Sequence, residues 1–148
     1  MNSNTHRENE VAIIHKLIED YVKGVHAKDI NKIMSQYAPN IRSFDAVSQL
    51  QFKGVNDYKR HWETCLSFCQ GAPLFEVQEL ETVVDGDLAV SYYLTYCGGT
   101  NEKDEAQGGW MRGTMVHRKI DEKWKIIHEH YSVPFDMKTG TPLFDLKP

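Results

Sequence analysis

The stretch FEVQELETVVDGDLAVSYYLTYCGG, residues 75–99, decides the fold class. Its two halves are rich in β-branched and aromatic residues, and Asp85-Gly86-Asp87 separates them, as in two strands joined by a tight turn. Two further segments of the same type follow at residues 108–120 and 123–133. Four successive strands with short polar turns predict an antiparallel meander.

The first half of the chain has a different periodicity. Apolar residues recur every three or four positions over residues 8–27, which predicts one long amphipathic helix. Two shorter helices are predicted at residues 27–40 and 55–71, with a pair of short strands, 41–45 and 49–52, between them. Helices followed by a sheet predict an α+β fold.

Length and charge limit the class of protein. The 148 residues fit a single domain, residues 1–148, which is long enough to bury a core. We expect residues 1–7 to be disordered and the tail, residues 134–148, to dock on the domain through its apolar side chains. The net charge is −4 and no basic cluster occurs, so nucleic acid is not an expected partner.

The three cysteines, Cys65, Cys69 and Cys97, contain no CxxC motif. Free thiols in a reducing cytoplasm are the simplest interpretation. Residues 1–10 lack the basic and apolar regions of a signal peptide. No run approaches the roughly 18 apolar residues that a transmembrane helix needs. We therefore expect a soluble, cytoplasmic protein without membrane contact.

Two segments resemble known families. Residues 20–45, DYVKGVHAKDINKIMSQYAPNIRSFD, resemble the opening of the ketosteroid isomerases, members of the nuclear-transport-factor-2-like (SnoaL-like) superfamily. Residues 114–132, TMVHRKIDEKWKIIHEHYS, are similar to the association domain of calcium/calmodulin-dependent protein kinase II, another member. The resemblance implies a cystatin-like α+β barrel, in which a curved mixed or antiparallel sheet forms a cone around the long N-terminal helix. Two further helices complete the cone, and its mouth is a pocket.

The isomerase resemblance implies roles for particular residues. Tyr21 matches the tyrosine that donates a hydrogen bond to the developing enolate, and Asp45 matches the proton-shuttling base. The second oxyanion donor of that family falls on Met115, which cannot donate, and one such donor contributes about 2.7–4 kcal/mol. The resemblance therefore argues against a true steroid isomerase. Judged by sequence pattern alone, Tyr21 equally fits a core position and Asp45 a turn.

Three histidines raise the question of a metal site. If Asp121-Glu122 forms a two-residue loop, His117 shares a strand face with His128 and His130, and a zinc-like site becomes credible. A three-residue loop, residues 120–122, places His117 on the opposite face. The kinase resemblance favours the three-residue loop, so we expect no metal and no other cofactor.

The isomerase resemblance also implies which side chains line the cone. On the last two strands the inward positions are Met115, His117, Ile127, Glu129 and Tyr131, and on the preceding strand they include Tyr92 and Tyr96. Trp62, on the third helix, is either core or pocket lining. A carboxylate such as Glu129 in an apolar cone either pairs with His117 or Tyr131, or has its pKa raised by desolvation.

These residues predict a small-molecule pocket. One hypothesis is an enzyme of isomerase, cyclase or hydratase type that acts on a small, mostly apolar substrate. Asp45 or Glu129 would be its general base, and Tyr21 or His117 the partner. The alternatives are a non-catalytic ligand binder and an oligomerisation module resembling the kinase association domain.

A homodimer is the expected assembly. On the register chosen above, the outer face of the sheet carries Trp110, Arg112, Ile126 and His128. That much apolar surface on a monomer is typical of an interface. We therefore predict that two copies pair through the outer face of the sheet.

Overall fold

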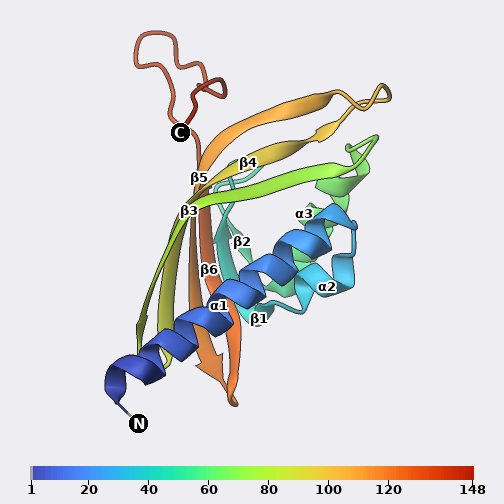
Figure 1. Ribbon diagram of the computed structural model, residues 1–148. Helices are drawn as coiled ribbons and strands as arrows, with labels where there is room; N and C mark the ends of the chain where they lie inside the picture. The colour runs from blue at the N-terminus through green and yellow to red at the C-terminus, as the bar shows by residue number, and fades with distance from the viewer. Residues whose placement is uncertain (1) are drawn as a thin grey trace.

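The computed structural model describes residues 2–148 and contains one curved six-stranded sheet that curls over a long N-terminal helix (Figure 1). Its elements are α1 Ser3–His26, α2 Ile30–Met34, β1 Tyr37–Phe44, β2 Phe52–Lys53, α3 Val55–Ser67, β3 Pro73–Asp85, β4 Leu88–Thr100, β5 Ala106–Ile120 and β6 Lys123–Ser132. The strand order is β2-β1-β6-β5-β4-β3. The predicted α+β class is confirmed.

Helix α1 is longer than the predicted residues 8–27, because it begins at Ser3 with Asn2 as its N-cap. Residues 3–7, expected to be disordered, form its first turns, while Met1 lies outside the described residues. Across residues 2–148, none of the helices combines the length and apolar character that a membrane span requires. The stripe of α1 that packs on the sheet, mainly against β3, buries Ile14, Ile18, Tyr21 and Val25.

Strands β3 to β6 form the predicted antiparallel meander, and β1 pairs with β2 as predicted. Strand β1 also runs parallel to β6, which makes the sheet mixed. A bulge in β3 between Gln78 and Glu81 places Glu79 at a φ of 53°. Bulges bend the strand that contains them and increase its twist, which helps the sheet to curl over α1.

The turn between β5 and β6 differs from the prediction. Ile120 pairs with Lys123, so the loop contains only Asp121 and Glu122, with φ values of 49° and 66° that are typical of a type I′ hairpin. The predicted three-residue loop is therefore wrong. Further along the hairpin, a bulge at Ile127 shifts the register and reverses the alternation of side chains.

Because of this bulge, β6 buries Trp124 and Ile126 before it and Glu129 after it. His117 pairs with Ile126 on the concave side, and His128 points to the outer face. The predicted separation of these histidines is correct, although the bulge and not the loop causes it. The expectations that Ile127 lines the cone and that Ile126 lies outside are wrong.

Strand β4 presents the opposite face from the one predicted. Ser91 pairs with Met115, so the two share the concave side, and both Ser91 and Tyr93 are buried there. Tyr92 is 45% exposed on the outer face, and Tyr96 lies on that same side. The isomerase resemblance implied the wrong alternation for this strand. The hydrophobic pattern could not correct it, because β4 carries tyrosines on both faces.

The tail, residues 134–148, forms a loop that projects beyond the sheet (Figure 1). Phe135 and Pro142 form an isolated bridge within it, and Met137 is 93% exposed. Phe144 returns to the domain, where its backbone lies so close to Gly109 of β5 that a Cβ at Gly109 would collide with it. Phe144 is therefore one point at which the tail contacts the domain, and docking of the other tail residues remains a prediction.

Candidate active site

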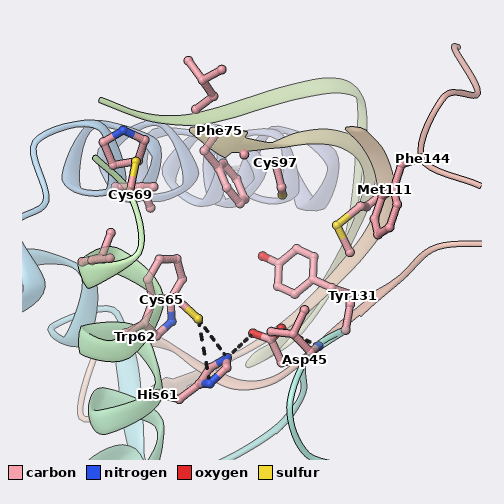
Figure 2. Close-up of a pocket in the computed structure, with 17 residues that line it drawn as sticks. Asp45, His61, Trp62, Cys65, Cys69, Phe75, Cys97, Met111, Tyr131 and Phe144 are labelled. Carbon is pink, nitrogen blue, oxygen red and sulfur yellow. Dashed lines mark hydrogen bonds and ion pairs between the residues drawn. The ribbon is translucent and has the colours of Figure 1, made fainter. Parts of the chain in front are cut away.

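A pocket with a volume of about 350 Å³ opens between α3, the end of α1 and the ends of the long strands (Figure 2). Its walls are mainly apolar. The large side chains among them are Trp62, Leu66, Phe75, Met111, Tyr131 and Phe144. The size and the apolar walls suit a small, mostly apolar molecule.

All three cysteines lie in the wall of this pocket, and all three are free thiols (Figure 2). Burial raises the pKa of Cys97 to about 11, although a hydrogen bond with Thr95 acts against the rise. Cys65 is exposed, and its sulfur lies 3.6 Å from Nε2 of His61. The thiols therefore differ in accessibility, and the sulfur of Cys65 lies beside the imidazole of His61.

Asp45 directly follows β1 and lies in the pocket wall opposite α3. Its Oδ2 lies 3.2 Å from Nε2 of His61, and the amide of Val47 donates to its Oδ1 at 3.3 Å. The side chains of Asp45 and His61 are only 18% and 5% exposed. A carboxylate and an imidazole thus form an ion pair inside a largely apolar pocket (Figure 2).

His61 is held in its charged form. Burial lowers its pKa, but hydrogen bonds with Asp45 and Cys65 and the charge of Asp45 outweigh burial and raise the pKa to about 9. The rings of Phe52 and Tyr58 stack on the imidazole, with centroids 4.2 and 5.8 Å away. At neutral pH the pair therefore presents a fixed proton donor, His61, beside a proton acceptor, Asp45.

Tyr58 connects this pair to a carboxyl group in the core. Its hydroxyl lies 3.0 Å from Asp45 Oδ2 and 2.5 Å from Glu129 Oε1. Glu129 is fully buried and also accepts a hydrogen bond from Tyr37 at 2.8 Å. Burial raises the pKa of Glu129 to about 8, against the effect of these two donors. Glu129 therefore has the pKa raised by desolvation that the sequence analysis gave as one alternative. Its hydrogen-bond partners are Tyr37 and Tyr58, which the sequence did not indicate.

Tyr21 lies in the core and does not line the pocket. It has no exposed surface, and its hydroxyl lies 3.0 Å from that of Tyr37. Burial, together with the charge of Glu129, raises its pKa well above the usual value. Met115 is also fully buried. The tyrosine expected to donate to a bound ligand is therefore a partner of the Glu129 cluster.

Three of the predicted site residues, Asp45, Trp62 and Tyr131, do line this pocket. The hydroxyls of Tyr131 and Tyr93 lie 2.8 Å apart. Nε1 of Trp62 is buried without a hydrogen-bond partner among residues 2–148. A polar group of a ligand placed beside Trp62 would satisfy that donor.

The other histidines named by the sequence lie elsewhere. Burial lowers the pKa of His117 to about 4, and neither ring nitrogen finds a partner within the described chain. A ring nitrogen of His128 donates to the Arg42 carbonyl at 2.6 Å, and His128 and His130 both pack on Phe44. Residues 2–148 contain no group of three His, Cys, Asp or Glu side chains arranged to hold a metal ion.

His61 is the candidate that the sequence analysis missed. It follows Tyr58 by three residues and precedes Cys65 by four, so the three share one face of α3. This spacing is a usable signal, although Trp62 at the next position dominates the hydrophobic pattern. Tyr37, which binds Glu129, precedes any recognisable strand pattern and gives no comparable signal.

The SnoaL-like domain family matches residues 14–136, which include the cone and most of the pocket wall. The solved structure of a nuclear-transport-factor-2-like protein of unknown function from Pseudomonas putida is 44% identical, with a TM-score of 0.86. That match covers 93% of this chain and 95% of the other. The chain therefore belongs to the SnoaL-like domain family, one of the nuclear-transport-factor-2-like groups.

Two more distant structures share the fold. A putative dehydratase of the nuclear-transport-factor-2-like family from Streptomyces avermitilis is 16% identical, with a TM-score of 0.73 over 85% of this chain and 97% of that one. A putative calcium/calmodulin-dependent protein kinase II association domain from Xanthomonas campestris is 22% identical, with a TM-score of 0.66 over 84% of each chain. At these identities the likeness concerns the fold alone. No curated protein matches the chain.

Proposed function

We propose that the protein binds a small, mostly apolar molecule in this pocket and catalyses proton transfer on it, as isomerases, dehydratases and cyclases do. The observation that carries the proposal is the ion pair of Asp45 and His61, 3.2 Å apart in an apolar cavity of about 350 Å³. Trp62 and Tyr131 line the same cavity and would hold the ligand.

The two charged groups would have complementary roles. Asp45 takes a proton from the carbon beside a carbonyl group; the C–H electron pair forms a C=C bond to the carbonyl carbon, and the carbonyl π pair moves onto its oxygen to give an enolate. In a dehydration the enolate re-forms the carbonyl, its electrons make a new C=C bond that expels a hydroxyl from the β carbon, and that hydroxyl takes the proton of His61 and leaves as water. In an isomerisation the enolate re-forms the carbonyl while another carbon of the conjugated system takes the proton of His61. Both charged side chains are largely buried in an apolar wall, where such interactions are stronger than in bulk solvent.

The proposal is tested with 1-indanone, a small aryl ketone, by following exchange of its α-protons in D₂O by NMR. We expect the protein to accelerate exchange and Asp45→Asn to remove about 100-fold or more of the acceleration, the usual contribution of a general base. Asp57→Asn, the same change on the exposed side of α3, should keep the rate. Equal exchange by wild type and Asp45→Asn would contradict the proposal.

Binding is measured separately by quenching of tryptophan fluorescence with 1-indanone. Trp62 lies in the pocket wall, so Trp62→Phe should abolish most of the quenching. Saturable quenching without any exchange by the wild type would contradict proton transfer and would favour the non-catalytic binder.

We also propose that two copies pair through the outer face of the sheet. A structure with the same fold is named an association domain. In this chain a groove on the outer face is lined by Tyr92, Leu94, Arg112 and Thr114, and Tyr92 is 45% exposed. An exposed aromatic beside aliphatic and arginine side chains is typical of interface composition.

A further inference from the structure

A line of hydrogen bonds runs from the core to the pocket wall through five side chains. The hydroxyls of Tyr21 and Tyr37 are 3.0 Å apart, and Tyr37 reaches Oε1 of Glu129 at 2.8 Å. Tyr58 reaches the same Oε1 at 2.5 Å and Oδ2 of Asp45 at 3.0 Å. These four contacts join three hydroxyl groups and two carboxyl groups.

If both carboxyl groups were ionised, this line of side chains would have too few protons to place one in each of its four contacts. Each hydroxyl has a single proton, so Tyr21, Tyr37 and Tyr58 together supply three protons for four contacts. Tyr58 in particular can donate to only one of its two carboxyl partners. A hydroxyl oxygen 2.5–3.0 Å from a carboxylate oxygen without a proton between them would be repelled. A fourth proton must therefore sit on Glu129 or Asp45.

The surroundings of the two carboxyl groups decide where that proton rests. Asp45 faces the cation of His61 at 3.2 Å and its side chain is 18% exposed, so a proton placed on Glu129 leaves this ion pair intact. Glu129 is fully buried, and its Oε2 has no partner in residues 2–148. Beside it β5 presents Met115, which does not titrate. The titratable side chains around Glu129 are Tyr21, Tyr37, Tyr58, Tyr93, Tyr131 and Asp45, with the thiol of Cys97 farther off.

We propose that Glu129 stores one proton and exchanges it with Asp45 through the hydroxyl of Tyr58. In the transfer, the proton on Glu129 Oε1 passes to the oxygen of Tyr58 while the Tyr58 proton passes to Oδ2 of Asp45. Glu129 becomes the carboxylate, Asp45 becomes the acid, and Tyr58 regains a proton. The return step reverses these moves, so no outside proton is consumed.

The consequence for catalysis rests on the function proposed above. With this store, Asp45 can act as an acid as well as a base without waiting for a proton from solvent. Glu129 does not touch a ligand in the pocket, so it is a positioning residue that acts through Asp45. The store itself is a property of the ligand-free protein, and it can be tested without any turnover.

The location of the proton is read from the infrared C=O stretch of protonated carboxyl groups in the ligand-free protein. We expect a band at about pH 6 that disappears as the pH rises through about 8, the pKa of Glu129. The absorbance of the neighbouring tyrosines should change with the same midpoint. Protein grown with ¹³C-glutamate should shift the band, and protein grown with ¹³C-aspartate should leave it in place. A band that shifts only with aspartate labelling, or no band at all, overturns the proposal.

Two variants that keep Glu129 intact should move its midpoint in opposite directions. Asp45→Asn removes the neighbouring charge and frees the Tyr58 proton for Glu129, so the midpoint should fall by about one pH unit. Tyr37→Phe removes a donor to the Glu129 carboxylate and is off the path to Asp45, so the midpoint should rise. General loosening of the core would move both midpoints the same way, which overturns the proposal.

The role of Tyr58 is isolated by a double-mutant cycle. In a Tyr58→Phe background, Asp45→Asn should lower the Glu129 midpoint by much less than it does in the wild type. In a Tyr37→Phe background, the matched removal of the other hydroxyl, the Asp45 effect should persist. An Asp45 effect unchanged by Tyr58→Phe would overturn transfer through Tyr58. If the protein still exchanged the α-protons of 1-indanone in that case, the proton store would be disproved and the proposed proton-transfer function would not.

Discussion

Glu129 and His61 both bind a proton more tightly in the folded chain than in the unfolded chain. Burial raises the pKa of Glu129 from 4.5 to about 8. Against the opposing effect of burial, Asp45 and Cys65 raise the pKa of His61 from 6.5 to about 9. Each group therefore contributes full stability below its unfolded pKa and loses that contribution as the pH rises through its folded pKa.

We expect the free energy of unfolding to fall between about pH 6.5 and 8, by roughly 1 kcal/mol per pH unit for each of the two groups. Urea unfolding at a series of pH values measures it. Glu129→Gln should flatten the curve between 4.5 and about 8, and His61→Gln should flatten it between 6.5 and about 9. A stability that rises across the shared window would contradict both assignments.

At the scale of single residues, the sequence predicts some members of the candidate site and does not predict their partners. Asp45 could be named because it matches the proton-shuttling base in the isomerase resemblance, and Trp62 because it lies on the inner face of a predicted helix. The partnership of Glu129 with Tyr37 and Tyr58 could not, because those contacts join segments 92 and 71 residues apart. Nothing local in the sequence specifies such a pairing.

At the scale of elements, two departures from the predicted geometry cancel in the hairpin of β5 and β6. The two-residue loop would bring His117 to the face of His128, and the bulge at Ile127 moves it back. The order and type of the elements follow from hydrophobic periodicity and could be predicted. The bulge could not, because nothing in the residues around Ile127, two isoleucines between polar side chains, identifies a bulge in a sequence.

The turn of this hairpin carries a cost that a substitution should remove. Glu122 has a φ of 66°, a left-handed conformation that is unfavourable for a residue with a side chain. Type I′ turns favour glycine at this second position. We expect Glu122→Gly to raise the free energy of unfolding by about 0.5–1 kcal/mol, measured by urea denaturation.

Glu122→Ala serves as the matched control for this prediction. It removes the same side-chain charge but keeps the Cβ that makes the left-handed conformation unfavourable. We expect no gain from it. An equal gain from alanine would assign the effect to charge and would contradict the conformational explanation.

At the scale of the whole molecule, the outer face of the sheet is the surface that we expect to be covered. Leu94 lies there opposite Arg112 of the neighbouring strand, beside the exposed Tyr92. We expect sedimentation equilibrium to show a dimer at micromolar concentrations. Leu94→Arg, which places a second cation beside Arg112 in each copy, should shift the protein to the monomer.

Phe68→Arg is the control for this dimer prediction. Phe68 is 82% exposed at the end of α3, away from the outer face of the sheet, so its replacement should leave the dimer intact. A wild-type monomer at micromolar concentrations would contradict the proposed interface. Dissociation caused equally by both variants would place the interface elsewhere.

The contact of Phe144 with Gly109 has a consequence for how such proteins diverge. The family match ends at residue 136, yet Phe144, beyond that boundary, forms part of the pocket wall. Asp45 and His61 both lie inside the shared region. A change in the length or composition of the tail would alter one wall of the cavity and leave Asp45 and His61 in place. Trp62 and Tyr131 lie within the shared region, so Phe144 is a part of the wall that can vary outside the span the family has in common.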